Sequence, residues 1–296
     1  MTTTNAAPDT AFNWTANPGK TFIPLENNPS VLTHLLHTWG VRPTLTFHDI
    51  YSLDPSSGLL SFIPRPVHAL ILIVPAHIYH PCRDNENDQL PLYTGSGADE
   101  PIFWARQTIG HACGTMAALH AVANGPARKH IIPDSALAKL LKGAEPLGPE
   151  PRAQLLYDSE DLEAAHASAA GLGDSRAPAK EEPNSNHFIA FVVGDDRGLW
   201  ELNGGMKGPV RRGTLEEGED ALSERALDLG VRGFLEEAKR VGEGEIGFSI
   251  VALAEGGESD GRYEEWVMGL AWVGVGMVYF TSDDLTLGVK DRYGEH

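Results

Sequence analysis

The chain has 296 residues, of which 42% are hydrophobic and 22% charged, values that are typical of a soluble globular protein and favour neither a disordered nor a fibrous one. Its net charge of -18 would repel a phosphate backbone and attract a basic partner, so we expect no nucleic acid as ligand. The longest apolar run, Trp266 to Phe280, is shorter than the roughly 20 residues of a membrane span, and we expect no membrane partner.

The cysteine content and the N-terminal residues point to a reducing compartment. Only two cysteines occur, Cys82 and Cys113, and the first residues contain neither the basic nor the apolar region of a secretion signal. We therefore expect the cytoplasm, with the nucleus as the alternative. Residues 1–20 are polar and have no periodicity, which predicts a flexible arm.

The first predicted helix follows this arm. Asn28 can cap it, Pro29 suits its first turn, apolar side chains fall on one face between Val31 and Trp39, and Gly40 ends it. The apolar face indicates that this helix packs on a core.

Two further elements are predicted in the first half of the chain. The uninterrupted apolar run from Ala69 to Val74 favours a central strand covered on both faces, so helices are expected on both sides. The segment from Cys113 to Ala123 is rich in Ala, Met and Leu and precedes Asn124-Gly125-Pro126, which predicts a helix that ends there, with Gly125 as a left-handed cap.

The second half of the chain begins with a loop and a hairpin. Residues 171–186 are rich in Gly, Pro and polar side chains, which predicts an exposed, flexible loop. Residues 187–193 and 199–202 have the composition of strands, and the Gly- and Asp-containing segment 194–198 between them predicts a hairpin. His187 opens the first of these strands.

Two more elements complete the predicted fold. Residues 221–240 have the periodicity of an amphipathic helix, and residues 247–253 alternate as a half-buried strand does. Because helices and strands are interleaved and neighbouring strands are joined by a hairpin, the fold class is predicted as α+β, with a largely antiparallel sheet between helices.

Cys113 is the first candidate for chemistry. A thiol attacks a carbonyl as the thiolate, and a position at a helix N-terminus beside an imidazole can lower its pKa. The neighbouring Gly110 and Gly114 leave room for a substrate carbonyl. An isolated cysteine at a helix start is more often a buried structural residue, so the surrounding motif decides between the two interpretations.

That motif runs Gln107-Thr-Ile-Gly-His-Ala-Cys113-Gly-Thr-Met, and a second block runs His187-Phe-Ile-Ala-Phe-Val-Val, followed by Leu199-Trp-Glu-Leu-Asn-Gly204. The first resembles the nucleophile motif of the ubiquitin C-terminal hydrolases. The second is similar to that family's strand pair with its catalytic His and acidic residue. The resemblance covers about residues 20–255. It implies Cys113 as nucleophile, His187 as general base and acid, and Gln107 as stabiliser of the oxyanion.

One residue departs from the family pattern. Asn203 occupies the position of the family's catalytic Asp, so the resemblance implies that it orients His187 without supplying a charge. We expect slower but real activity, because Cys-His-Asn arrangements are known to work. Asn203-Gly204 is also expected to form a tight turn after the strand, and both interpretations can hold together.

The resemblance further implies a papain-like fold with a knotted backbone, and a crossover loop above the active site that we assign to about residues 171–186. The predicted division is an arm over residues 1–20, a catalytic domain over residues 21–255 and an extension of unknown role over residues 256–296.

The predicted activity is that of a cysteine-type deubiquitinating hydrolase, which cleaves after the C-terminal Gly of ubiquitin and releases small or unfolded adducts. The alternatives are a ubiquitin-binding pseudoenzyme with decayed catalysis and a hydrolase that prefers a ubiquitin-like modifier. The expected partner is ubiquitin or such a modifier, and we expect a monomer.

No cofactor is expected, and no metal site either, because no Cys/His cluster has zinc-ligand spacing. His111 and His120 are expected to face solvent or pack in the core. Cys82 is interpreted as an incidental loop thiol, and Asp195 and Asp196 as solvated residues of the hairpin turn.

Overall fold

The computed structural model describes residues 19–173, 186–242 and 247–256. Most of the predicted N-terminal arm and of the predicted crossover loop, and nearly all of the predicted extension, including the apolar run from Trp266 to Phe280, lie outside these residues. Among the residues that are described, no helix combines the length and the apolarity needed to cross a membrane.

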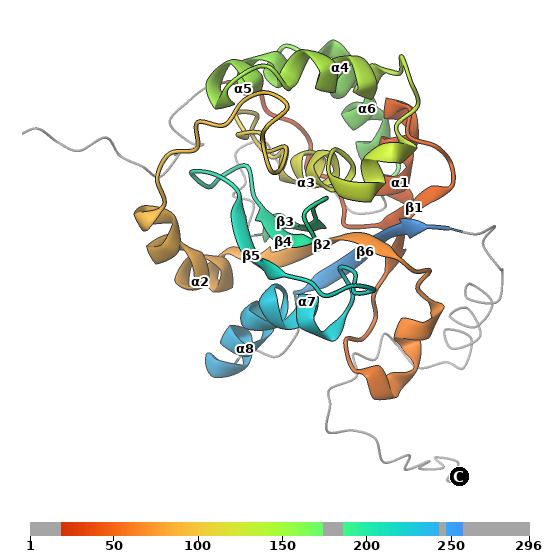
Figure 1. Cartoon of the computed structure of the whole chain (residues 1–296), viewed down its shortest axis with the longest axis vertical. Helices are drawn as coiled ribbons and strands as arrows, with labels where there is room; N and C mark the ends of the chain where they lie inside the picture. Colours follow the sequence, from red (N-terminus) through yellow and green to blue (C-terminus); the bar gives the residue numbers. More distant parts are fainter. Residues whose placement is uncertain (1–18, 174–185, 243–246, 257–296) are drawn as a thin grey trace, which may run out of the picture.

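The centre of the molecule is a six-stranded sheet in the order β1-β6-β2-β3-β4-β5 (Figure 1). Every neighbouring pair is antiparallel, which confirms the predicted sheet type. The strands are β1 (Leu45–Asp49), β2 (Val67–Pro75), β3 (Asn186–Val193), β4 (Gly198–Leu202), β5 (Val210–Thr214) and β6 (Ser249–Glu255).

Helices cover both faces of this sheet (Figure 1). One face carries α1 (Pro29–Trp39), α3 (Cys113–Val122), α4 (Ala136–Ala144), α5 (Pro149–Tyr157) and α6 (Glu160–Ala170). The other carries α2 (Ala76–Gln89), α7 (Glu224–Leu229) and α8 (Arg232–Arg240). Short 3-10 helices lie at η1 (Pro55–Ser57), η2 (Leu59–Phe62) and η3 (Gly125–His130).

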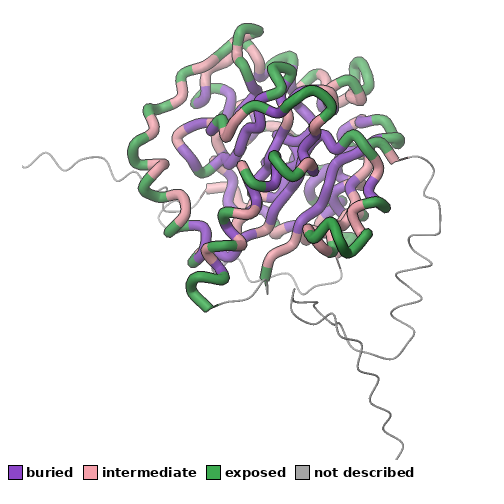
Figure 2. The backbone as a smooth tube through the Cα atoms, turned by 60° about the horizontal axis from the view of Figure 1, so that its bottom comes forward, coloured by how far each residue is buried: buried purple, intermediate pink, exposed green. Residues whose placement is uncertain are grey.

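Two hydrophobic cores lie between the sheet and its helices, and β2 contributes to both. Ala69 and Ile71 belong to the core under α1 and α3, whereas Leu70 and Leu72 belong to the core with α7 and α8. Successive side chains of a strand point to opposite faces, so an apolar run such as this one fits a strand that is buried on both sides. Figure 2 shows the buried backbone in the interior, and the predicted central strand is confirmed.

The predicted first helix is also confirmed. The side chain of Asn28 accepts a hydrogen bond from the backbone N–H of Ser30 at 2.8 Å, which satisfies one of the free donors at the helix start. Gly40 ends α1 in the left-handed conformation, with φ of 92°. A Cβ at Gly40 would lie 2.3 Å from Cβ of Ser135, so both the conformation and the close packing require glycine.

The predicted helix over residues 221–240 is wrong in its continuity. The chain forms two helices, α7 and α8, which are interrupted at Gly230 with φ of -120° and ψ of -89°. A Cβ at Gly230 would lie 2.9 Å from a ring atom of Phe191, so the chain approaches the sheet closely at this glycine. Periodicity does not reveal such a break, because both helices present their apolar faces to the same core.

Two smaller differences concern boundaries, since β6 covers Ser249–Glu255 rather than the predicted residues 247–253, and α3 also ends earlier than predicted. Helix α3 ends at Val122 with Ala123 as its cap, and Gly125, with φ of 52°, opens η3 rather than capping α3. The predicted hairpin is confirmed, since β3 and β4 pair from Ala190 with Leu202 to Val193 with Leu199. The last described strand, β6, lies between β1 and β2, and the predicted knot stays a prediction.

Candidate active site

Cys113 lies at the start of α3, as predicted, and is partly buried. Burial raises the pKa of its thiol, although the backbone N–H groups of Phe188, Gly114 and Cys113 itself favour the thiolate. The expected lowering of this pKa is therefore wrong in its net direction. The helix N-terminus acts in the expected sense, but removal from water penalises the charged thiolate more.

His187 lies at the edge of the same site, near the start of β3. It pairs with Val74 near the end of β2, and α2 begins immediately after that strand. Helix α2 therefore brings Tyr79 and His80 against His187, with ring centroids 4.5 and 5.7 Å from the imidazole of His187. Burial, together with the nearby His80, lowers the pKa of His187 to about 4, against a smaller opposite effect of Asp84.

The Cys113 thiol contacts the backbone directly after His187. One of the three N–H groups that favour its thiolate belongs to Phe188, the residue that follows His187. A Cβ at Gly114 would already lie 3.4 Å from the ring of Phe188, so glycine lets the start of α3 pack closely on β3. Because the thiol pKa is raised and the imidazole pKa lowered, both groups are neutral at pH 7.

Gln107, the predicted oxyanion stabiliser, is buried with its side chain held in place. Its Nε2 donates to the carbonyl of Ile109 at 3.0 Å, and its backbone N–H donates to the carbonyl of Gly204 at 2.9 Å. A side-chain amide has two N–H donors, so the bond to Ile109 orients the group and leaves a second donor. A Cβ at Gly204 would lie 2.7 Å from Cβ of Gln107, so this glycine lets the two segments meet.

Asn203 follows β4 and is buried beside these residues. Its Oδ1 accepts from the backbone N–H of Gly205 at 2.8 Å, and its Nδ2 donates to the hydroxyl of Tyr79 at 2.9 Å. Met206 N–H donates to the carbonyl of Asn203 at 3.2 Å, which confirms the predicted turn. The described part of the chain contains no hydrogen bond between Asn203 and His187, so the orienting role of Asn203 stays a prediction.

Tyr79 is the residue at this site that the sequence did not reveal. It bonds Asn203 through its hydroxyl and contacts His187 with its ring, so it lies between the two. The only available signal was its position in the chain, one turn after the end of the apolar strand run, and tyrosine at such a position has no specific meaning by itself.

The carboxylate on β4 does not replace the missing Asp. Glu201 is fully buried and forms ion pairs with Arg83 at 2.9 Å and Arg212 at 2.8 Å. A buried carboxylate needs such partners to remain charged. Both of its oxygens are therefore engaged with arginines of α2 and β5 rather than with His187.

The weaker candidates have structural roles. His120 is buried, its Nε2 accepts from the N–H of Ala105 at 3.1 Å, and burial lowers its pKa to about 3. His111 adopts a left-handed conformation with φ of 57°. Asp196 accepts from the N–H of Gly198 at 2.8 Å in the hairpin turn. The loop assignment of Cys82 is wrong, because this residue lies within α2, where burial raises its thiol pKa.

A second group of side chains, outside the active site, was not found from the sequence. One potential metal-ligand atom from each of His68, His130 and Glu255 lies within 4.8 Å of the other two. No short spacing connects these residues, since they come from three separate segments, and a search for local zinc motifs does not detect such a group.

Comparison with known proteins gives the same assignment as the motifs. The family model for ubiquitin carboxyl-terminal hydrolase, family 1, matches residues 22–235. A ubiquitin carboxyl-terminal hydrolase of Aplysia californica is 37% identical over 211 residues, which are 70% of this chain and 92% of that protein. The isozyme L1 of Rattus norvegicus is 34% identical over 232 residues, which are 78% and 97% of the two chains.

A solved structure supports the fold. The catalytic domain of Trichinella spiralis UCH37, bound to ubiquitin vinyl methyl ester, has a TM-score of 0.59 to this chain at 21% identity. The match covers 80% of this chain and 96% of that one, and supports the papain-like class of the fold. With the family model and both relatives in agreement, the chain belongs to family 1 of the ubiquitin carboxyl-terminal hydrolases.

Proposed function

We propose that the chain is a cysteine-type deubiquitinating hydrolase that cleaves the bond after the C-terminal glycine of ubiquitin. The observation that carries this proposal is the placement of the Cys113 thiol at the start of α3, against the backbone of β3 directly after His187. The relatives named ubiquitin carboxyl-terminal hydrolase, and the solved structure named as bound to ubiquitin vinyl methyl ester, support ubiquitin as the substrate.

The proposed reaction begins from a neutral thiol and a neutral imidazole. His187 accepts the thiol proton of Cys113 while the sulfur attacks the substrate carbonyl, and the second N–H of the Gln107 amide stabilises the oxyanion. His187 then gives its proton to the leaving amine. The amine departs, and the ubiquitin C-terminus stays bound to the Cys113 sulfur as a thioester. A water molecule loses a proton to His187 and attacks the thioester, and the proton returns to the Cys113 sulfur as the ubiquitin carboxylate leaves.

Asn203 sets the expected rate of this reaction. Proton transfer creates an imidazolium on His187, which a carboxylate at position 203 would stabilise and an amide does not. In addition, the amide of Asn203 is engaged with Tyr79 and Gly205. We therefore propose a slow hydrolase, with turnover limited by proton transfer to His187.

The negative charge of the chain supports a basic protein substrate. A net charge of -18 favours encounter with the basic face and the arginine-containing tail of ubiquitin. Such steering weakens as salt screens the charges, so the association rate with ubiquitin is expected to fall with rising ionic strength while turnover of the bound complex stays constant.

The test uses the full chain with ubiquitin that carries a fluorogenic group on its C-terminal glycine. Wild-type protein is expected to turn over repeatedly, and Cys113→Ala to lose turnover to the background rate while it still binds ubiquitin. Cys82→Ala is the matched control, because it removes the other thiol. Equal turnover by Cys113→Ala would overturn the assignment of the nucleophile.

A ubiquitin probe with a C-terminal electrophile separates the alternatives. Labelling of Cys113 without turnover of the fluorogenic substrate would favour the ubiquitin-binding pseudoenzyme. Faster turnover of a ubiquitin-like modifier than of ubiquitin would change the substrate but not the chemistry. For location we propose the cytoplasm, supported by the low cysteine content of two in the chain, and fluorescence of a tagged full chain tests it.

A further inference from the structure

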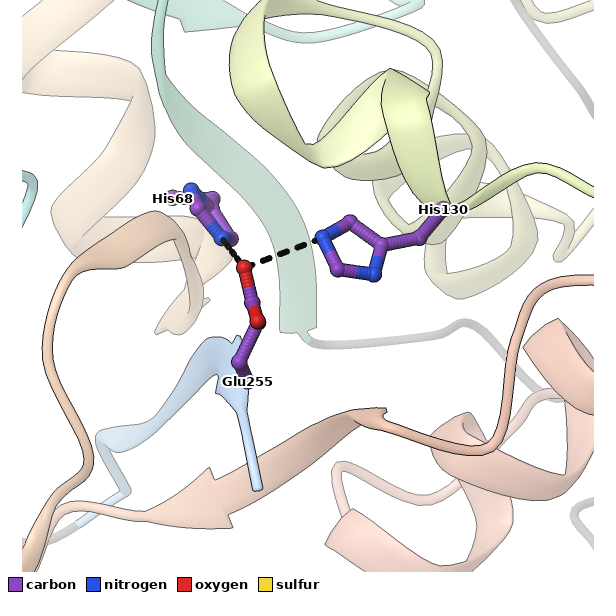
Figure 3. A group of neighbouring side chains, drawn as sticks. All are labelled: His68, His130 and Glu255. Atoms are coloured by element: carbon purple, nitrogen blue, oxygen red, sulfur yellow. Dashed lines mark ion pairs between the residues drawn. The ribbon is translucent and has the colours of Figure 1, made fainter. Parts of the chain in front are cut away.

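Three side chains from distant segments meet at one end of the sheet, outside the active site. The Nε2 of His130 lies 3.2 Å from Oε1 of Glu255, and the Nε2 of His68 lies 3.9 Å from the same oxygen. Figure 3 shows both imidazoles directed toward this carboxylate, with His68 on one side and His130 on the other. Two imidazoles and a carboxylate therefore converge on a small volume.

The backbone fixes the direction of His68. Strands β2 and β6 pair as Val67 with Ala254 and Ala69 with Leu253, so His68 is the extra residue of a β-bulge. A bulge changes the direction of a side chain relative to the regular alternation, and bulges recur beside functional sites. The bulge is thus the local feature that aims His68 at Glu255.

The other two residues are also held by backbone hydrogen bonds. His130 ends η3, and its carbonyl accepts from the N–H of Arg42 at 2.8 Å. Glu255 pairs with Leu45 in β1, and the next N–H, of Gly256, donates to the carbonyl of Thr44 at 2.8 Å. The three backbones are therefore set before any ligand arrives.

His68 has an unsatisfied polar atom directed into this group. Its side chain is only 5% exposed, and among the described residues its Nε2 has no hydrogen-bond partner. A buried nitrogen without a partner costs free energy, so such groups are uncommon in native proteins and call for a ligand. Glu255, by contrast, is 53% exposed in its side chain, which leaves a path from solvent.

We propose that His68, His130 and Glu255 form a binding site for a divalent transition-metal ion of the zinc type. Two imidazoles and one carboxylate are a known three-residue ligand set for zinc, with a fourth position left for water. Magnesium and calcium prefer all-oxygen ligands, so the two imidazoles disfavour them.

The spacing of the ligand atoms fits this ion after a small contraction. Bonds of about 2.0–2.1 Å in tetrahedral geometry separate ligand atoms by roughly 3.3 Å. The His130–Glu255 distance of 3.2 Å already matches, and the atoms of all three residues lie within 4.8 Å of one another. The His68–Glu255 distance of 3.9 Å has to shorten by about 0.6 Å to reach the same separation.

The site is separate from the catalytic residues. His68 and Val74, the partner of His187, are at opposite ends of β2, and a strand rises about 3.3 Å per residue, which separates them by roughly 20 Å. An ion here would join β2, β6 and η3, so we assign it a structural role that stabilises the folded chain without taking part in hydrolysis.

The test measures zinc binding by calorimetry on full-length Cys113→Ser, because the catalytic thiol is itself a possible zinc ligand. Glu255→Gln and His130→Asn are added to this background, and Glu236→Gln on α8 and His34→Gln on α1 serve as controls distant from the proposed site. One Zn²⁺ is expected per chain. Each ligand variant should bind it at least about tenfold more weakly, since even outer partners of metal ligands contribute 10–100-fold, and the controls within about twofold of the background.

Thermal melting provides the second measurement. Zn²⁺ should raise the melting temperature of Cys113→Ser and of both controls, and should not raise that of Glu255→Gln, which is solvent-exposed and should fold normally without metal. Mg²⁺ at the same concentration should have no effect. Equal zinc affinity with and without Glu255→Gln, or no zinc binding by the background protein, would overturn the proposal and leave only an ion pair between His130 and Glu255.

Discussion

The two ends of β2 each bring a histidine close to a second histidine, but the third partner differs. At the end near Val74, His187 lies against Tyr79 and His80, and the nearby carboxylate of Asp84 contacts His80 at 3.0 Å rather than His187. At the other end, Glu255 lies within 4 Å of both His68 and His130.

This difference shows how neighbours decide the role of an imidazole. Burial without a carboxylate partner keeps His187 neutral, and a neutral imidazole can accept the thiol proton. A second imidazole and a carboxylate aimed at one volume instead form a ligand set. At the active site the residue at position 203 is an amide, which supplies no charge to stabilise a protonated His187.

The largest expected effect is the loss of the base at the active-site end. His187→Gln should reduce turnover of a fluorogenic ubiquitin substrate by about 10³-fold, because it removes the group that accepts and returns the proton. His34→Gln, a histidine on α1 that bonds Ser168, is the control and should keep wild-type turnover. A loss of less than tenfold in His187→Gln would remove His187 from the mechanism.

The next effect is on stability and concerns two buried histidines of the helical layer. Burial lowers the pKa of His120 to about 3 and of His166 to about 4, from an ordinary value of 6.5. Below pH 6.5 the unfolded chain binds protons that the folded chain does not, so this stability is complete above pH 6.5 and is lost as the pH falls. When the pH falls from 6.5 to 5, the free energy of unfolding should drop by about 2 kcal/mol for each of these two histidines.

Urea denaturation at a series of pH values measures this effect. His166→Gln should remove the contribution of one histidine from the pH dependence, whatever its effect on stability at pH 7. An unchanged pH dependence would mean that His166 titrates alike in the folded and unfolded chain.

A smaller gain is expected from restoring the charge at the active site. Asn203→Asp should raise turnover by about tenfold and move the pKa of His187 upward, because a carboxylate stabilises the imidazolium that forms during the reaction. As the pH falls, kcat/KM of the wild type should not decline near pH 6.5, because burial lowers the pKa of His187 to about 4. The kcat/KM of the variant should begin to decline at a higher pH than that of the wild type. Identical pH profiles would show that position 203 does not act on His187.

The smallest expected effect is that of the Tyr79 hydroxyl. Tyr79→Phe keeps the ring beside His187 but removes the acceptor of the Asn203 amide, which should cost about 1 kcal/mol of unfolding free energy. Combined with Asn203→Ala, it should cost less than the sum of the two single changes. Full additivity in urea denaturation would show that this hydrogen bond contributes nothing.

The sequence predicted those features that depend on local pattern. The caps of α1, the doubly buried run of β2 and the β3–β4 hairpin follow from composition and periodicity within short segments. The motifs around Cys113 and His187 indicated the family, although burial, which no motif records, reversed the expected thiol pKa.

Features formed by distant segments were not predictable in this way. Tyr79 reaches Asn203 across 124 positions of the chain, and the break at Gly230 depends on the approach to Phe191. Likewise, His68, His130 and Glu255 are brought together by the sheet and η3. Only the tertiary structure specifies these contacts.

The central place of β6 has a consequence for synthesis of the chain. Because β6 fits between β1 and β2, these two strands cannot be joined into one sheet until residues 249–255 have left the ribosome. Until then β2 keeps an unpaired, apolar edge, which is prone to wrong pairing. We therefore expect a chain that stops before residue 249 to be prone to aggregation, because the apolar β2 edge that β6 would cover stays open.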